Sequence, residues 1–395
     1  MEPFYRTHNY LLTHLDTPIV RRVLMDEINW NERLIGIKGS RGIGKTTFLL
    51  SYAKELYGTG NNKCLYVNLN HFFFTERTLF DFAEEFHSQG GETLLIDQVF
   101  KYPEWSKELR KCYDKLPGLK IVFTGSAVMR LKEENPDLAG KVSVYYLRGF
   151  SFREYLNLTD NKDFRIYGLN EMIDNHKNIA KEITKKLGKK LMIDFKDYLH
   201  HGFYPFYLEK RNYSENLLKT INMTLEVDVL NIRQIEQRYL PKIRKLLYLL
   251  SLEAPCTPNV SQLSKELEIS RATVMNYIKY LKDARLVNML YDKGMDFPKK
   301  PALVYVYNTN LQYVINLKPL NRLTEYKTFF YNQIQKDLQA YKSKKKADFL
   351  INGNLHFCVM ENNPYKNDAN VYYAVNEQET VGENVIPLWL FGFLY

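Results

Sequence analysis

The first 150 residues alternate between short apolar runs and longer amphipathic segments. The apolar runs lack a regular polar alternation, which is typical of strands buried on both faces of a parallel sheet. The segments between them have helical spacing, and a Gly follows each where a helix would end. The predicted strands are RLIGIKG (33–39), CLYVNLN (64–70), TLLIDQV (93–99), KIVFTGS (120–126) and VYYLRGF (144–150). The pattern therefore predicts an α/β domain over residues 1–150, with helices on both faces of a parallel sheet.

The strand pattern stops after this point, and three further parts are predicted. Residues 151–240 read as a helical lid. Residues 241–318 combine three helices with two short strands, which predicts a winged helix-turn-helix whose third helix has Ser270 as its N-cap. Residues 319–395 mix a helix with a hairpin, and the apolar run VIPLWLFGFLY is expected to form a final strand.

A glycine-rich turn separates the first predicted strand from the first predicted helix. The sequence GSRGIGKTT, residues 39–47, matches G-x-x-x-x-G-K-[ST] in that structural context. Its glycines let backbone N–H groups turn toward phosphate oxygens, and the helix N-terminus adds positive charge. Lys45 is expected to reach the β- and γ-phosphates, and Thr46 to offer a hydroxyl to Mg²⁺. The cofactors expected are therefore ATP or ADP with Mg²⁺, and the candidate binding residues are Gly39, Ser40, Arg41, Gly42, Ile43, Gly44, Lys45, Thr46 and Thr47.

The strand TLLIDQV carries an amide beside its acid. Asp97 is expected to hold Mg²⁺ opposite Thr46. The strand CLYVNLN is expected to pair between the two motifs, as in P-loop ATPases that activate water with a glutamate next to the Asp. Gln98 stands in that place, and an amide can hold water but cannot accept its proton. We therefore expect nucleotide binding to persist and hydrolysis to be slower by roughly 10²- to 10⁴-fold.

The origin of Gln98 stays open between a deliberate Glu-to-Gln substitution and natural divergence. The next strand ends in Thr124 and Ser126, where a polar side chain can contact the γ-phosphate or the attacking water. Short polar residues at a strand end also commonly cap the following helix, so both roles are open for these two residues.

Five segments together resemble one bacterial family of AAA-type ATPases, which is similar to the AAA+ and STAND ATPases. They are RLIGIKGSRGIGKTT, LLIDQVFKYPEWSKELR, KIVFTGSA, LRGFSFREYL and IPLWLFGFLY, and they extend over nearly the whole chain. The resemblance implies a P-loop NTPase sheet of the ASCE/AAA type, a helical lid, a winged helix and a C-terminal domain related to the PD-(D/E)XK nuclease fold. It also places the catalytic glutamate of the family on Gln98.

The chain departs from the family pattern beside the nucleotide site. Phe100 stands where the family tends to have His, and Gly140 and Lys141 stand where it tends to have an Arg pair. The source of a trans-acting arginine is therefore open. Arg148 and Arg153 remain candidate phosphate sensors, although a structural pairing with a nearby acid is the alternative for Arg153.

The C-terminal part departs further. A PD-(D/E)XK site needs an Asp, a second acid and a Lys around a divalent metal. Asp348 fits the first position, but the second acid falls on Cys358 and the Lys on Met360. Glu361 is displaced by three residues, which places it on the other face of a strand. We therefore expect this domain to have a packing or binding role, and nuclease activity is disfavoured.

The charge balance adds a candidate partner. Lys and Arg exceed Asp and Glu by 55 to 45, which fits either a nucleic-acid partner or a lysine-rich surface. The candidate DNA contacts lie on the third winged-helix segment and are Arg271, Thr273, Asn276 and Lys279. Lysines near the wing, 293, 299 and 300, and the segment KSKKKAD add positive charge. Such a helix can instead serve packing or oligomer contacts.

The remaining composition indicates a protein of the cytoplasm without a membrane partner. No run of eighteen apolar residues is present, the N-terminus lacks the pattern of a signal peptide, and the four cysteines have no CxxC spacing. Three functions stand as hypotheses: an ATP-driven or ATP-gated switch acting on DNA or a protein, a non-hydrolysing nucleotide-gated scaffold, and a DNA nuclease. A homo-oligomer is expected by analogy, because AAA-type sites usually lie at subunit interfaces.

Overall fold

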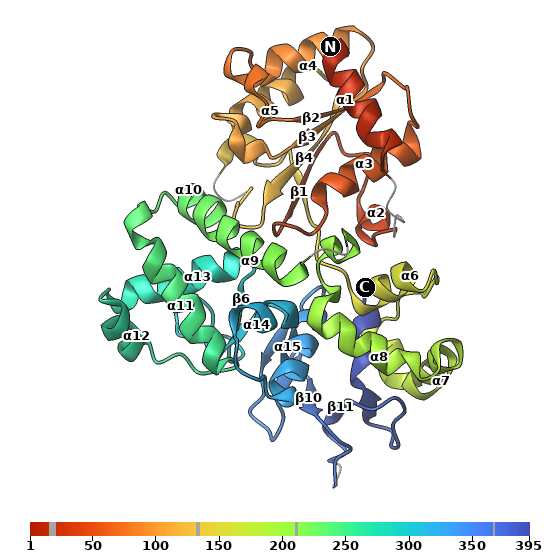
Figure 1. Cartoon of the computed structure of the whole chain (residues 1–395), viewed down its shortest axis with the longest axis vertical. Helices are drawn as coiled ribbons and strands as arrows, with labels where there is room; N and C mark the ends of the chain where they lie inside the picture. Colours follow the sequence, from red (N-terminus) through yellow and green to blue (C-terminus); the bar gives the residue numbers. More distant parts are fainter. Residues whose placement is uncertain (16–20, 132–134, 210–211, 366–367) are drawn as a thin grey trace. The chain divides into compact units, whose positions relative to one another are not determined.

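The computed structural model describes residues 1–15, 21–131, 135–209, 212–365 and 368–395 (Figure 1). The chain divides into two compact units, Met1–Gly149 and Phe150–Tyr395. Within the described ranges, every helix is too short or too polar to span a bilayer. The four cysteines are unpaired.

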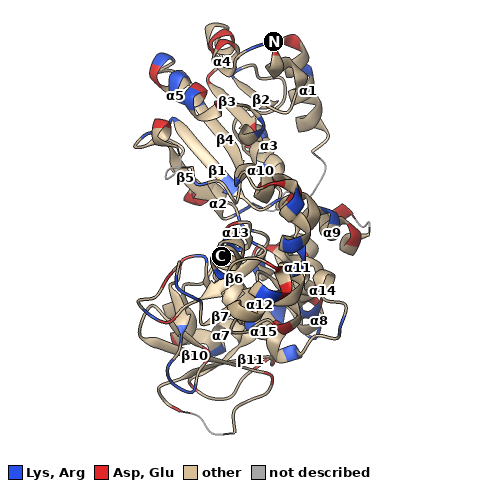
Figure 2. Ribbon diagram, turned by 90° about the vertical axis from the view of Figure 1, so that its left-hand side faces the viewer, with Lys and Arg blue, Asp and Glu red and all other residues tan. Residues whose placement is uncertain are grey.

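The first unit is built around a five-stranded sheet. Its strands are β1 (Leu34–Gly39), β2 (Cys64–Asn68), β3 (Thr93–Asp97), β4 (Lys120–Ser126) and β5 (Ser143–Tyr146), and its helices are α1 (Glu2–Thr13), α2 (Leu24–Glu27), α3 (Lys45–Leu56), α4 (Leu79–Ser88) and α5 (Trp105–Lys115). All strand pairs are parallel. Helices α1 and α3 pack together on one face, and α4 and α5 on the other (Figure 2). The predicted parallel sheet with helices on both faces is confirmed.

The strand order corrects one expectation. The order is β2-β3-β4-β1-β5, so the strand between β1 and β3 is β4 and not CLYVNLN. The latter forms β2 at the edge of the sheet and pairs only with β3. Its continuous apolar pattern resembles that of a central strand because α1 packs against it and buries it, as shown by the fully buried side chains of Cys64 and Leu65.

The second unit combines ten helices with two sheets among the described residues. Its helices are α6 (Phe152–Thr159), α7 (Leu169–Leu187), α8 (Lys190–Asp197), α9 (Tyr213–Met223), α10 (Leu230–Ile232), α11 (Leu240–Glu253), α12 (Val260–Leu267), α13 (Arg271–Asp283), α14 (Thr309–Ile315) and α15 (Arg322–Ile334). A hairpin of β6 (Val287–Leu290) and β7 (Leu303–Val306) follows α13, and Ser270 caps α13 by accepting the N–H of Thr273 at 3.0 Å. These elements occur in the predicted order, and the winged-helix assignment stays a prediction.

The C-terminal sheet has the order β12-β11-β10-β9-β8. Its strands are β8 (Ala340–Lys342), β9 (Phe349–Ile351), β10 (Leu355–Met360), β11 (Tyr372–Val375) and β12 (Val385–Pro387). The predicted hairpin is present as β9 and β10. The predicted final strand over 385–395 is wrong beyond Pro387, because residues Leu388–Phe393 form a 3-10 helix. Pro387 lacks the N–H that a ladder would need, and the run that follows is apolar because it is buried on all sides.

The parts predicted as separate domains after residue 150 share one core. Phe152 and Leu191, from the predicted lid, belong to the same cluster of buried side chains as Phe330, Phe357 and Trp389 from the C-terminal part. Gly392 lies so close to Phe152 that a Cβ would stand 2.4 Å from the Cβ of that ring residue. The chain therefore has two compact units where four parts were expected, because the final residues complete the core around α6 and α8.

Candidate functional site

The phosphate loop starts at the carboxyl end of β1 and leads into α3. Gly42 and Gly44 have φ values of 79° and 86°, which side-chain-bearing residues rarely adopt. A Cβ on Gly39 would lie 2.6 Å from the carbonyl oxygen of Leu147, so only glycine fits there. The sequence match therefore corresponds to a loop whose backbone curvature requires glycine at these three positions.

The lysine of the loop folds back onto its own backbone. The Lys45 ammonium donates to the carbonyl oxygens of Gly39 at 2.9 Å and of Ser40 at 2.7 Å. An ammonium group has three donors and no acceptor, so these carbonyls hold it over the concave side of the turn. Lys45 is thus positioned within the loop where a phosphate oxygen could take over one of its hydrogen bonds.

Asp97 connects the phosphate loop to the neighbouring strands. Its Oδ2 accepts the Thr46 hydroxyl at 2.6 Å and the Tyr66 hydroxyl at 2.9 Å. Its Oδ1 accepts the Thr124 hydroxyl and the Gln98 N–H, the latter at 3.1 Å. Asp97 is 2% exposed. The two side chains predicted to hold Mg²⁺, Thr46 and Asp97, therefore meet at the carboxyl edge of the sheet, where parallel α/β folds bind ligands.

Gln98 begins a sharp turn directly after β3. Its φ of 58° is left-handed, which is uncommon for a residue with a side chain. The turn is stabilised because the Gln98 N–H also lies 3.0 Å from the Thr124 hydroxyl. The residue is half-buried, so an amide, which cannot accept a proton, lies at the same sheet edge as Asp97.

The two polar residues at the end of β4 differ in what they contact. Thr124 is fully buried and donates to Asp97. Ser126 accepts the N–H of Val128 at 3.4 Å, which is a turn-capping contact. The structure thus gives Thr124 a place in the Asp97 network and Ser126 the capping role that was the alternative for both.

Tyr66 and His8 contribute to this network and had no part in the motifs. Tyr66, on β2, donates its hydroxyl to Asp97, and burial together with that carboxylate raises the pKa of the phenol. His8, on α1, is fully buried, and its Nδ1 accepts the N–H of Tyr66 at 3.1 Å. The sequence offers one hint of the role of Tyr66. It lies two residues before Asn68 on β2, and Asn68 pairs in register with Asp97 on β3.

The two candidate phosphate sensors have different surroundings. Arg148 follows β5 at the edge that carries the phosphate loop, and Arg22 links the two by donating to the carbonyls of Arg148 at 2.5 Å and Ile43 at 3.3 Å. Arg153 belongs to the second unit, where it donates to the carbonyl oxygens of Tyr395 at 3.0 Å and Phe164 at 3.1 Å. These contacts favour the structural alternative for Arg153.

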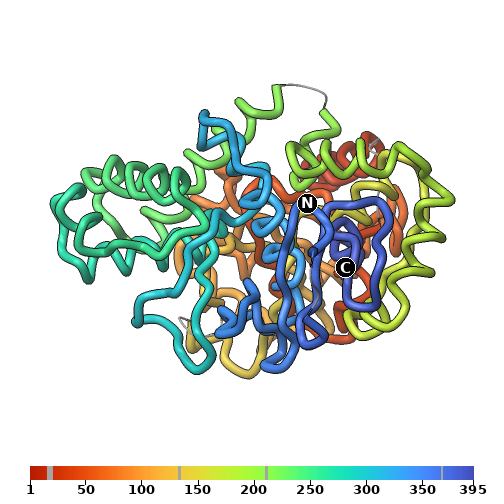
Figure 3. The backbone as a smooth tube through the Cα atoms, turned by 90° about the horizontal axis from the view of Figure 1, so that it is seen from below, coloured from red at the N-terminus to blue at the C-terminus, as the bar shows by residue number. Residues whose placement is uncertain are grey.

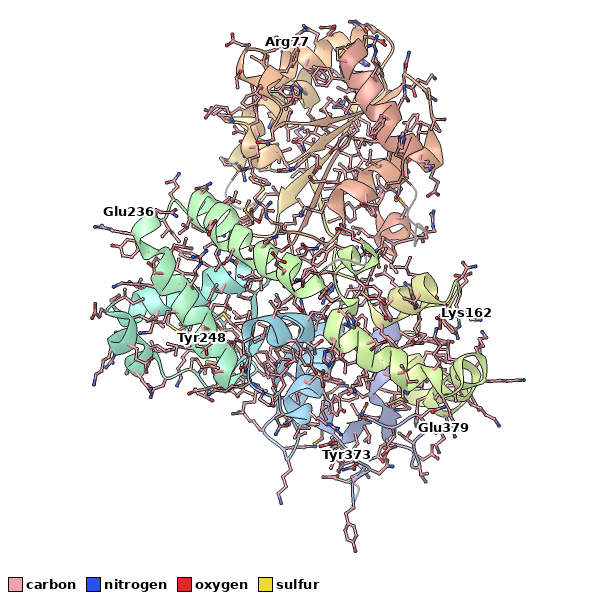
Figure 4. All side chains as sticks on the ribbon, in the orientation of Figure 1. Arg77, Lys162, Glu236, Tyr248, Tyr373 and Glu379 are labelled. Carbon is pink, nitrogen blue, oxygen red and sulfur yellow. The ribbon has the colours of Figure 1, made fainter. Side chains whose placement is uncertain are left out.

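The C-terminal sheet places a lysine against Asp348. Lys327, on α15, lies 2.6 Å from Asp348 Oδ1, and the N–H of Val359 donates to Oδ2 at 2.9 Å. Cys358 and Met360 pack against an apolar cluster that includes Tyr373, labelled in Figure 4. Burial raises the pKa of Cys358 to about 11, so its thiol is neutral near pH 7.

Metal-ligating side chains are not clustered at this sheet. Within the described ranges, no three His, Cys, Asp or Glu side chains form a group that could hold a metal ion.

The predicted polar face of α13 is only partly exposed. Arg271 and Asn276 are exposed, whereas Thr273 bonds to the cap residue Ser270 at 2.8 Å between their hydroxyls. The ammonium of Lys279 pairs with Asp283. Two of the four candidate DNA contacts therefore have partners within the chain.

Comparisons with known proteins agree with the geometry of the first unit. Residues 31–156 match the family described as AAA domain, and residues 192–294 match a domain of unknown function, DUF8612. The chain is similar to an uncharacterised protein of Methanocaldococcus jannaschii, with 28% identity over 280 residues that make up 67% of this chain and 58% of that protein. The chain thus spans less than two thirds of the length of that relative.

Two solved structures share a distant likeness. The Aeropyrum pernix ORC1 protein in complex with DNA has 10% identity and a TM-score of 0.29, covering 80% of this chain and 92% of the other. PCH-2 of C. elegans has 15% identity and a TM-score of 0.24, covering 71% and 66%. The parallel sheet with its phosphate loop shows that the first unit has a P-loop NTPase fold, and residues 31–156 of the chain are similar to the AAA domain family.

Proposed function

We propose that the chain is an ATP-binding switch in which Mg-ATP is held by residues 39–47 and Asp97, and in which Gln98 slows hydrolysis. The observation that carries this proposal is the 2.6 Å contact between the Thr46 hydroxyl and Asp97 beside a fully formed phosphate loop. The loop N–H groups and Lys45 would hold the phosphates, and Thr46 and Asp97 would hold the metal. The bound Mg²⁺ supplies charge neutralisation at the phosphates.

The residues of this site fit such a ligand. Gly42 and Gly44 allow the positive φ angles with which the loop turns, and hydroxyl and carboxylate oxygens are the ligands that Mg²⁺ prefers. Asp97 is held on both oxygens by four donors, so its orientation is set before any ligand arrives. Binding is therefore expected to survive although the proton acceptor is missing.

Nucleotide binding and turnover test the two parts of the proposal separately. A fluorescent ATP analogue should bind in the presence of Mg²⁺ and lose affinity in Lys45→Ala. Steady-state turnover should be slow for the chain as it stands and rise in Gln98→Glu by roughly 10²- to 10⁴-fold. Thr75→Ala, an exposed hydroxyl on the same unit, serves as a control that should change neither quantity. Absence of Mg²⁺-dependent binding would refute the proposal.

A non-hydrolysing scaffold is the second candidate function. Gly140, with a φ of 69°, and Lys141 occupy the segment where the family has an Arg pair, and the Lys141 ammonium lies 5.3 Å from the centre of the Tyr113 ring. In this reading, ATP assembles a homo-oligomer that does not turn over. Light scattering with and without Mg-ATP distinguishes the two, because the scaffold predicts an ATP-dependent mass increase and no turnover in Gln98→Glu at high protein concentration.

A further inference from the structure

Two basic loops that are distant in the sequence meet in the second unit. The loop between β6 and β7 carries Lys293, Lys299 and Lys300, and the loop between β8 and β9 carries residues 344–346, all lysines. The Lys342 N–H donates to the carbonyl of Tyr291 at 2.8 Å, which joins the bases of the two loops. Figure 3 shows the hairpin loop beside the C-terminal segments. The six lysines 293, 299, 300 and 344–346 are named the basic loop surface.

The positive charge of this surface is only partly offset by carboxylates of the described residues. All six lysines are exposed, and none forms an ion pair with another residue of the described ranges. Lys293 reaches the turn between β9 and β10, where its Nζ lies 3.5 Å from the carbonyl of Gly353. Four carboxylates lie in or beside these loops. Asp348 already pairs with Lys327, so six ammonium groups against the remaining three, Asp292, Asp296 and Asp368, leave an excess of three positive charges.

The recognition-type helix α13 is less available for contacts than these loops. Lys279 pairs with Asp283, which also contacts Arg233 at 3.3 Å. Arg271 remains as an exposed cation among the four residues predicted to contact DNA. The two loops therefore carry exposed lysines that can contact phosphates, whereas the lysines of α13 are half-buried.

We propose that the basic loop surface binds the phosphate backbone of duplex nucleic acid without sequence preference. Lysine acts as a point charge toward phosphate. The backbone hydrogen bond between the two loops keeps their two sets of three lysines in a fixed arrangement. Single-stranded nucleic acid is usually held by stacking on exposed aromatic rings, and the exposed large apolar residue in these loops is Met295. A duplex therefore suits this surface better than a single strand.

The test compares three triple variants of the full chain that lose the same charge. Two of them change Lys293, Lys299 and Lys300 to Gln, or residues 344–346 to Gln. The control changes Lys181 and Lys185 on α7, and Lys189 just after that helix, to Gln; these lysines are equally exposed and form no ion pair with another described residue. Fluorescence anisotropy of a labelled duplex of mixed sequence, at about 50 to 200 mM salt, gives the dependence of affinity on salt concentration.

The logarithm of the binding constant falls linearly with the logarithm of the salt concentration, and each phosphate contact adds about 0.9 to the steepness of that fall. Each loop variant loses three lysines, so its line should be less steep by about 2.7. Over a fourfold increase in salt, the affinity of the unchanged chain should then fall about 40-fold more than that of either loop variant. The control triple should keep the slope of the unchanged chain. Thermal unfolding of each variant confirms that the fold is intact.

Three results would overturn the proposal. One is an unchanged chain that does not bind the duplex at about 50 mM salt. Another is an equal loss in the α7 control, which would assign binding to net charge alone. The third is binding to phosphatidylserine vesicles that the loop variants lose while duplex binding persists, which would assign the surface to a membrane. None of these outcomes depends on nucleotide binding by the first unit.

Discussion

Acidification should destabilise the first unit through a single histidine next to the proposed nucleotide site. His8 is fully buried between α1 and β2, and burial lowers the pKa of its imidazole to about 4 from an ordinary value of 6.5. Its Nδ1 accepts the Tyr66 N–H at 3.1 Å, so protonation at that atom would replace an acceptor with a second donor. Its Nε2 is buried and has no hydrogen-bond partner in the described residues.

The direction and size of the change in stability with pH follow from proton binding at His8. Between pH 6.5 and pH 4 the unfolded chain binds a proton at His8 and the folded chain does not, so stability falls as the pH falls. With a folded pKa of about 4, the loss relative to pH 7 is ~2 kcal/mol at pH 5 and ~3 kcal/mol at pH 4. The contribution is complete above pH 6.5 and disappears as the pH falls through 4.

Urea unfolding at pH 7, 6 and 5 measures this contribution. Hydrogen exchange of peptides that cover β2 and β3, corrected for intrinsic rates, restricts the readout to the first unit. The variant His8→Gln keeps a polar side chain that cannot titrate, so its stability should fall by ~2 kcal/mol less than that of the unchanged chain between pH 7 and 5. His14→Gln, an exposed histidine just after the same helix, is the control. Identical pH dependence in His8→Gln and the unchanged chain would refute the argument.

Three further changes should have measurable effects. Tyr66→Phe removes one hydrogen-bond donor to Asp97 and keeps the ring. Nucleotide affinity measured with Mg²⁺ should therefore fall roughly tenfold, whereas affinity measured in EDTA should stay the same. Equal losses in both conditions would contradict this. Gly392→Ala should lower the stability of the second unit by about 1–3 kcal/mol by overpacking against Phe152, whereas Gly168→Ala, with open space around it, should not; thermal unfolding of both variants decides. Ser151→Ala removes a capping box at the start of α6 and should cost about 1 kcal/mol in urea unfolding, and an unchanged midpoint would show that the cap contributes nothing.

The candidate nucleotide site could be proposed from the sequence because its residues lie in short motifs. A phosphate loop needs glycine where φ is positive or where a Cβ would clash, and residues 39, 42 and 44 meet that need locally. Asp97 was predictable because an acid at the end of a buried strand lies at the ligand edge of any parallel sheet. The inability of Gln98 to accept a proton can likewise be read from that one residue.

Strand order and long-range partners were decided by the tertiary structure. CLYVNLN was expected between the two motifs, but apolar pattern does not distinguish a central strand from an edge strand that a helix covers. Tyr66 and His8 enter the network only through the pairing of β2 with β3 and the packing of α1. These contacts join Tyr66 to Asp97, 31 positions apart, and His8 to Tyr66, 58 positions apart.

The second unit shows the same division between local pattern and assembly. Its helices and hairpins follow local periodicity, but its core joins Phe152 to Trp389, and no local pattern reveals that the final residues pack against α6 and α8. The two lysine loops are evident as basic segments in the sequence, whereas their meeting depends on a hydrogen bond between Lys342 and Tyr291. The sequence by itself determined the groups that can act, and the fold determined which of them act together, because burial and contact are properties of the assembled chain.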